Sequence, residues 1–164
     1  PLVVQLRFAR SEFVRCLQGL ADEDAQERLG PTNSISWMIG HLANQEHFYW
    51  CILGLEMFVA PGLNDLVGCG KPASTPPLDE MWDVWRLVTG TADPFLDSLQ
   101  AAQLTTFLEF NGKPARESIG TMLLRNIYHY WFHTGEAHAV RQQLGHGELP
   151  QFVGSMAEAF YRVE

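Results

Sequence analysis

The chain of 164 residues is long enough to bury one hydrophobic core without disulfides, so we expect a single domain over residues 1–164. Its 11 Lys and Arg against 19 Asp and Glu give a net charge of −8, which argues against nucleic acid as a partner. Three widely spaced cysteines without a C-x-x-C pair fit a reducing compartment. Because charged residues and histidines interrupt every apolar run well before the roughly 20 residues of a membrane span, we expect a cytoplasmic protein with no membrane partner.

The first third of the chain predicts two amphipathic helices. Apolar residues recur at steps of three and four, which predicts a helix over residues 2–20. After a polar break, Asn33 or Ser34 can cap a second helix over residues 34–53. Residues 55–77 are rich in Gly and Pro and have no sustained period, so they are expected to form a long connection, either a lid over an open site or an ordinary crossover packed on the bundle.

Two further helices are predicted in the rest of the chain. The third covers residues 78–99, and Pro94 is expected to kink or interrupt it. The fourth covers residues 118–144 and is followed by Gly145, which suits a left-handed C-cap. Minor elements are expected on either side of this helix: a short extended piece at residues 105–109 with an Asn111-Gly112 turn, and one short helix within residues 146–164.

Short connections within each helix pair and a long one between the pairs favour an all-α fold. The pattern is typical of a four-helix bundle in up-down-down-up order, with residues 55–77 as the crossover between the second and third helices.

Helical geometry selects three histidines. His129 and His133 are separated by about 40° on one helix face, whereas His138 lies about 180° from His129. His41, in an antiparallel second helix, would lie at the same height in the bundle as this pair, while His47 is rotated by about 120° from His41.

Three imidazoles from two helices make a facial set for a divalent metal, with positions left for water or substrate. Zn or Ni suits the imidazoles best, and Fe or Mn is also compatible. The H-E-x-x-H protease pattern is absent because Tyr130 occupies the place of the glutamate. Two other interpretations stay open: histidines hydrogen-bonded in the core of a metal-free dimer, and a metal that only ties two helices together.

Two stretches, "ISWMIGHLANQEHFYW" and "HYWFHTGEAHAVRQQLG", resemble the signature helices of the DinB/YfiT-like family of metalloenzymes. The resemblance implies an up-down-down-up bundle in which His41, His129 and His133 bind a divalent metal. It also implies chemistry on a small molecule, as in relatives that act with low-molecular-weight thiols. The family name carries no implication of DNA binding.

These observations favour a metal-dependent enzyme, a thiol-dependent transferase or a hydrolase. Glu136 would orient an imidazole or accept a proton, although a solvated or salt-bridged glutamate with Arg125 or Arg141 is an equal alternative. Asn44 and Gln45 lie close in angle to His41 and are candidates for substrate binding. The alternative function is a non-catalytic, metal-stabilised binding or sensing module.

The aromatic residues around the histidines also predict an assembly. Tyr128, Tyr130, Trp131 and Phe132 point around most of the fourth helix, although a bundle helix needs only one apolar stripe. Either the C-terminal segment or a second copy of the chain must cover part of this surface, and a homodimer is expected.

Overall fold

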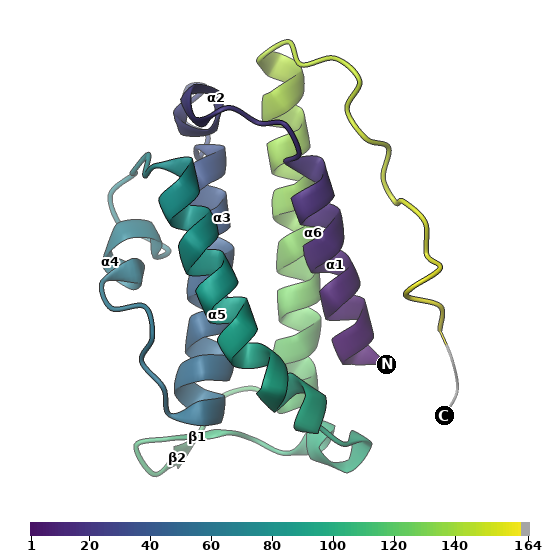
Figure 1. The fold of residues 1–164 in the computed structure, drawn as a ribbon. Coiled ribbons are helices and arrows are strands. Elements are labelled where there is room, and N and C mark those ends of the chain that lie inside the picture. The colour runs from purple at the N-terminus through teal and green to yellow at the C-terminus, as the bar shows by residue number, and fades with distance from the viewer. Residues whose placement is uncertain (162–164) are drawn as a thin grey trace.

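The computed structural model describes residues 1–161, and its architecture is an all-α bundle (Figure 1). Helices α1 and α6 run in one direction, whereas α3 and α5 run in the other, which confirms the predicted up-down-down-up order. The long helices are α1 (Leu2–Cys16), α3 (Ile35–Glu46) with its π-helical continuation η1 (His47–Gly54), α5 (Leu78–Ser98) and α6 (Ile119–Gln143).

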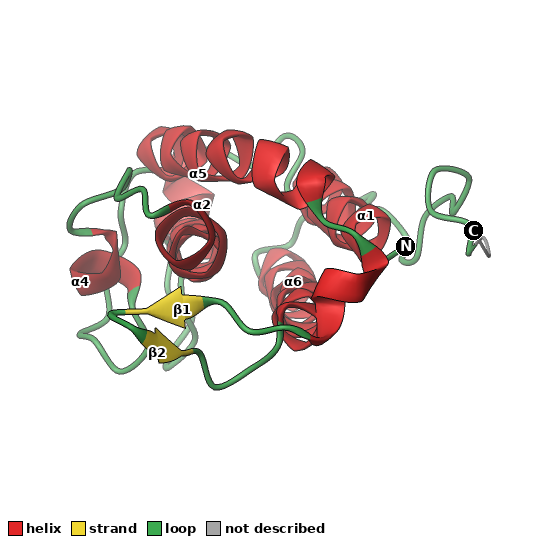
Figure 2. Ribbon diagram, turned by 90° about the horizontal axis from the view of Figure 1, so that it is seen from below, coloured by secondary structure: helices red, strands yellow, loops and turns green. Residues whose placement is uncertain are grey.

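The long helices form a ring of neighbours, which is clear in the view along them (Figure 2). α1 packs on α6, and α3 packs on both α5 and α6. The α3–α6 contact brings together the two histidine-bearing helices. None of the described helices is long and apolar enough to cross a membrane.

The caps place both histidine-bearing helices where the sequence predicts them. The Ser34 hydroxyl accepts a hydrogen bond from the Trp37 amide at the start of α3 (3.2 Å), and the Ser118 hydroxyl accepts one from Thr121 at the start of α6 (3.3 Å). Gly145 adopts the left-handed conformation that follows the end of α6, with φ of 81°. α5 continues through Pro94, so the expected interruption does not occur.

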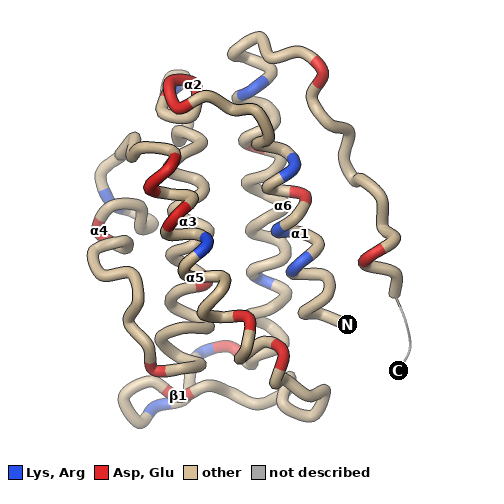
Figure 3. Tube along the Cα trace, in the orientation of Figure 1, with Lys and Arg blue, Asp and Glu red and all other residues tan. Residues whose placement is uncertain are grey.

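Between residues 16 and 67 the structure differs from the prediction in three places. The first helix ends at Cys16 rather than near residue 20, because a turn with Gly19 at φ of 71° follows. Two short helices went unpredicted: α2 (Asp22–Gln26), an acidic turn at one end of the bundle (Figure 3), and α4 (Leu63–Val67), within the long crossover. Leu63 and Val67 are buried against α3, so the crossover is packed on the bundle rather than a bare loop.

The predicted turn at Asn111-Gly112 is confirmed. Both residues have positive φ values, 52° and 71°, and join the antiparallel strands β1 (Glu109–Phe110) and β2 (Lys113–Pro114). The extended segment therefore begins later than expected, since η2 (Ala101–Thr105) is a 3-10 helix.

The short helix predicted in the C-terminal segment is wrong for the residues that the structure describes, up to 161. This segment instead runs outside α1 (Figure 1), and side chains of α1 bind its backbone. Glu12 accepts a hydrogen bond from the Gly154 amide (2.7 Å), and Gln5 donates one to the Ala159 carbonyl (2.7 Å). Backbone groups used in this way are satisfied without a helix.

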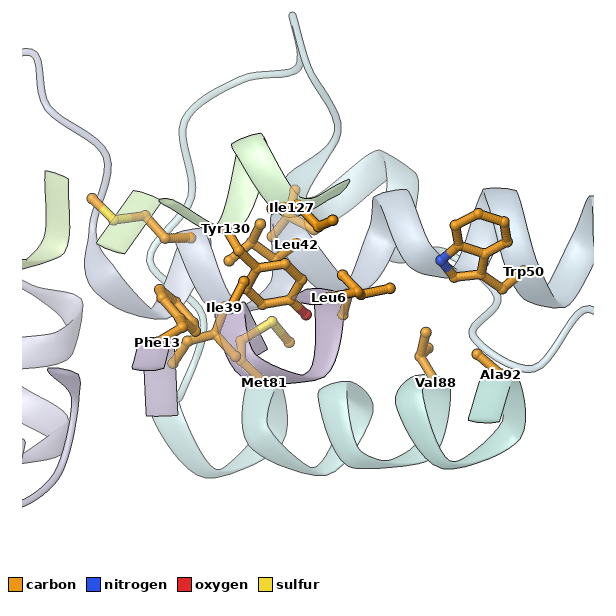
Figure 4. Close-up of a cluster of buried hydrophobic side chains, with 14 of the residues drawn as sticks. Leu6, Phe13, Ile39, Leu42, Trp50, Met81, Val88, Ala92, Ile127 and Tyr130 are labelled. Atoms are coloured by element: carbon orange, nitrogen blue, oxygen red, sulfur yellow. The ribbon is translucent and has the colours of Figure 1, made fainter. Parts of the chain in front are cut away.

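The core between the helices combines a large apolar cluster (Figure 4) with a buried ionic network. Glu46 is fully buried and accepts hydrogen bonds from Arg10 Nε (2.8 Å) and the Tyr130 hydroxyl (2.6 Å). Tyr130 in turn accepts a hydrogen bond from Trp85 Nε1 (2.8 Å). These side chains come from α1, α3, α5 and α6, so the network links all of the long helices and fixes α6 beside α3.

Candidate metal centre

His41 of α3 and His129 and His133 of α6 converge on one point between the two helices. One ring nitrogen of each lies within 4.8 Å of the others. The Nε2 atoms of His129 and His133 are 3.0 Å apart, and the His41 ring centre is 4.9 Å and 5.4 Å from the centres of the other two. The antiparallel pairing of α3 and α6 therefore brings together the three residues that helical geometry selected.

Each of these imidazoles makes a hydrogen bond from Nδ1 to an oxygen atom. The distances are 2.8 Å from His41 to the Val67 carbonyl, 3.0 Å from His129 to Gln45 Oε1, and 2.7 Å from His133 to the Glu136 carboxylate. A carbonyl, an amide oxygen and a carboxylate are acceptors, so Nδ1 must carry the proton in all three rings. In the neutral rings every Nε2 then has a free lone pair.

The orientation of the Gln45 amide is decided by a chain of hydrogen bonds that begins at Trp50. An indole N–H can only donate, so Asn126 accepts at Oδ1 (2.7 Å) and must donate from Nδ2. Its acceptor is Gln45 Oε1 (2.5 Å), the same atom that binds His129. Because Trp50 and Asn126 are fully buried, water cannot replace these partners, and the tautomer of His129 follows from the donor at the start of the chain.

This donor set fits a divalent cation. Two Nε2 lone pairs face each other across 3.0 Å, which is repulsive unless a proton or a cation lies between them. Burial is the main cause that lowers the pKa of His129 to about 3, and the neighbouring His133 and His41 lower it further. Burial also lowers the pKa of His41. Neutral imidazoles are the form that binds metals, so these three residues could hold Zn²⁺ or a similar ion.

Trp37 completes the packing around His41, and sequence reasoning missed its part in the site. Its ring stacks on the His41 imidazole with centres 4.3 Å apart and an angle of 15° between the planes. The spacing of four residues between Trp37 and His41 on one helix was the available signal.

Comparison with protein families identifies the superfamily of the chain. The model of the DinB superfamily matches residues 5–137, a range that contains all three histidines. The chain belongs to the DinB superfamily. A search of curated proteins found no match.

In this DinB-superfamily chain, His41 and His129 face a cleft of about 950 Å³ between α3 and α6. Asn44 and Gln45, the predicted substrate-binding residues, also line this cleft. The Asn44 amide donates to Asn64 Oδ1 (3.1 Å), so α3 and α4 meet at its wall. Since Oε1 of Gln45 is used by His129 and Asn126, the amide nitrogen of Gln45 is the group left to contact a substrate.

Glu136 lies on the far side of the His133 ring from the other imidazoles, because it binds Nδ1 whereas Nε2 faces His129. Its position suits the predicted orientation of an imidazole. The predicted alternative of a salt bridge does not form with Arg125, which pairs with Glu117, or with Arg141, which donates to the Cys16 carbonyl and to His146.

The remaining histidines lie apart from this site. His47 is buried, and its Nε2 accepts hydrogen bonds from the amides of Val59 and Ala60 (3.1 Å and 3.3 Å). His138 packs against Phe152 of the C-terminal segment, with ring centres 5.5 Å apart. His47 thus anchors the start of the crossover, and His138 contacts the C-terminal segment.

Proposed function

We propose that His41, His129 and His133 bind a divalent metal and that the chain is a metal-dependent enzyme acting on a small molecule. The observation that supports this most directly is the convergence of three unprotonated Nε2 atoms, each on a ring whose Nδ1 is oriented by an oxygen atom. Three protein ligands beside an open cleft are typical of catalytic rather than structural metal sites. Zn or Ni suits this set best, and Fe or Mn is compatible.

The proposed reaction is a thiol-dependent transfer or a hydrolysis. A bound divalent cation would lower the pKa of a thiol or water and polarise an electrophile. Glu136 would orient His133 for metal binding by accepting the hydrogen bond from its Nδ1 (2.7 Å). Asn44 and Gln45 would position the substrate from the α3 wall of the cleft.

Metal content tests the ligand assignment. His41→Ala, His129→Ala and His133→Ala should each strongly reduce the metal bound by protein purified without a histidine tag or chelator. His138→Ala is the matched control, because its ring lies on the same helix but contacts Phe152. Full metal content in any of the three variants would remove that residue from the ligand set.

A metal-stabilised binding or sensing module is the second candidate, because Cys69 lines the same cleft as His41 and His129. Cys69 is not among the residues whose ligand atoms lie within 4.8 Å of one another, so its thiolate would have to move toward the histidines to close the fourth position and leave no place for substrate. The Co²⁺-substituted protein separates the two functions. A sulfur-to-metal charge-transfer band before any thiol is added, lost in Cys69→Ser, supports the module. A band that appears only with an added low-molecular-weight thiol supports the transferase.

If added thiols leave the Co²⁺ spectrum unchanged while water-like ligands alter it, hydrolysis becomes the better assignment. Ligand binding should release a proton when a thiol or water becomes anionic at the metal, which calorimetry in two buffers of different ionisation enthalpy detects.

We also propose that the protein is a cytoplasmic homodimer. Of the aromatics on α6, Tyr130 is buried in the core and Trp131 packs against Phe8, whereas Tyr128 and Phe132 line the cleft. A second copy would therefore use exposed apolar side chains outside the cleft, such as Leu87 on α5. Light scattering at micromolar concentration tests this, and a mass of one chain at every concentration would exclude the dimer.

A further inference from the structure

The walls of the cleft beside the histidines carry an unusual amount of exposed apolar surface. Its apolar lining residues are Phe48, Tyr49, Leu124, Tyr128 and Phe132. Leu124, Tyr128 and Phe132 follow one another at steps of four along α6 and form one stripe, and Tyr128 and Phe132 are 64% and 66% exposed. Phe48 of η1 lines the same cleft and is 44% exposed. A cleft of about 950 Å³ is at the upper end of the size of sites for small organic molecules.

The charges in the cleft differ from those of the chain as a whole. The chain carries a net charge of −8, yet no Asp or Glu occurs among the described residues that line the cleft. Arg125 lines it, one helical turn from His129, which corresponds to a rise of about 6 Å. Glu117, which pairs with Arg125, binds Nε (2.8 Å) and Nη2, so Nη1 is the donor through which Arg125 can bind an anion.

The order of these groups along α6 sets how a ligand would lie. A divalent metal held by the histidines and Nη1 of Arg125 would together bind a negatively charged head group. The adjacent stripe of Leu124, Tyr128 and Phe132 would then contact an apolar body attached to that group. A cation is disfavoured mainly by the divalent metal, because the charge of Arg125 is largely offset by its ion pair with Glu117.

We propose that the cleft binds small organic anions with an aromatic or otherwise flat apolar body, such as an aryl-substituted carboxylate or thiolate. This proposal rests on the proposed metal site and adds the substrate class to it. The anionic group binds at the histidines and Arg125, and the apolar body packs between the α6 stripe and Phe48. Specificity then comes from Tyr128 and Phe132, and the metal supplies affinity for the head group.

Calorimetric titration of the zinc-loaded protein with three related probes tests the proposal. They are 3-phenylpropionate, propionate, which lacks the ring, and 3-phenylpropylamine, which carries the opposite charge. We expect 3-phenylpropionate to bind at least about tenfold more tightly than propionate, because most of the ring leaves water in the cleft. The amine should bind at least about tenfold more weakly than 3-phenylpropionate.

Variants test whether the tighter binding of 3-phenylpropionate depends on the stripe on α6. The double substitution Tyr128→Ala and Phe132→Ala should reduce the advantage of 3-phenylpropionate over propionate to within about twofold, whereas propionate binds as before. Both side chains are exposed, so the fold should not depend on them. Phe107→Ala, which removes a 51% exposed ring outside the cleft, is the matched control and should leave the advantage unchanged.

Cys69 offers an independent readout, because it lines the cleft and is exposed whereas Cys16 and Cys51 are buried. Saturating 3-phenylpropionate should slow alkylation of Cys69 by iodoacetamide, and propionate should slow it less.

The proposal would be overturned if 3-phenylpropionate and propionate bound with equal affinity. It would also be overturned if 3-phenylpropylamine bound as tightly as 3-phenylpropionate. A dimer in light scattering that the double substitution dissociates would also overturn the proposal, because a second copy of the chain would then cover the stripe. Zinc content is measured before any probe is added. A protein that binds no zinc refutes the proposed metal site, whereas zinc-loaded protein that does not distinguish the carboxylates refutes only the substrate class.

Discussion

Gln45 provides the sharpest test of how the site is organised, because one oxygen atom accepts from both His129 and Asn126. Replacing it with leucine leaves a branched apolar side chain one bond shorter and removes the acceptor. Nδ1 of His129 then loses the partner that keeps its proton there, and the tautomer with the proton on Nε2 becomes accessible. That tautomer cannot bind a metal through Nε2.

Gln45→Leu should lower both the metal affinity and the free energy of unfolding. Loss of a hydrogen-bonding partner to a metal-binding histidine typically lowers metal affinity by about 10- to 100-fold, or about 1.4 to 2.7 kcal/mol. Asn126 is fully buried, and its unpaired Nδ2 would lower the free energy of unfolding by about 1 to 3 kcal/mol. In a chain of this size each kcal/mol corresponds to a shift of about 2 to 4 °C in Tm.

The matched control is Gln45→Glu, whose carboxylate accepts from both neighbours and so preserves the tautomer. Competition with a chelating dye gives the zinc affinity of each variant, and ¹⁵N chemical shifts of the imidazoles in chelator-treated protein give the tautomers directly. We expect Nδ1-protonated His129 in the wild type and in Gln45→Glu, and a mixture of tautomers in Gln45→Leu. Zinc affinity of Gln45→Leu within about twofold of wild type, with an unchanged tautomer, would refute the role of Gln45.

Three further predictions concern the scaffold around the site. Tyr130→Phe removes the hydroxyl that donates to the buried Glu46, so urea unfolding should show a loss of about 1 to 3 kcal/mol; an unchanged midpoint would contradict the role of the network. The folded-state pKa of His129 is about 3, below its ordinary 6.5, so below pH 6.5 the unfolded chain binds a proton that the folded chain does not. Stability of the metal-free protein should therefore fall by at most about 1.4 kcal/mol per pH unit for this residue between pH 6.5 and 3, and His129→Gln should flatten that slope. In Gly40→Ala the new Cβ would lie 2.5 Å from Met81 Sδ in the α3–α5 contact, so thermal unfolding should show a loss of about 1 to 3 kcal/mol, whereas Gly90→Ala, which meets open space on α5, should show none.

Much of the site could be predicted because its information is local. The positions of His129 and His133 on one face depend only on the pitch of an α-helix, and the start of α6 depends on a serine cap within the same stretch of chain. The turn at Asn111-Gly112 was predictable for the same reason, since few residues adopt positive φ readily. The height of His41 required only the bundle order, which connection lengths suggest.

Other features depend on partners that are distant in sequence and leave no periodic pattern. The carbonyl of Val67 orients His41 across 26 positions, and Trp50 reaches Asn126 across 76. A backbone carbonyl looks the same at every residue, so no composition or spacing could show which one would meet His41. The sequence contained the Trp50 and Asn126 side chains but not their pairing.

The C-terminal segment shows tertiary contacts overriding a local sequence preference. A short helix was expected there, but Glu12 and Gln5 of α1 bind its backbone in a non-helical form over the described residues. A short isolated helix is marginal in water, so contacts from a neighbouring helix readily override its local preference. The sequence alone therefore determined the four long helices and which of their faces carry the histidines. Packing decided the tail, the partners of each imidazole and the walls of the cleft, because these depend on atoms that meet only when the bundle closes.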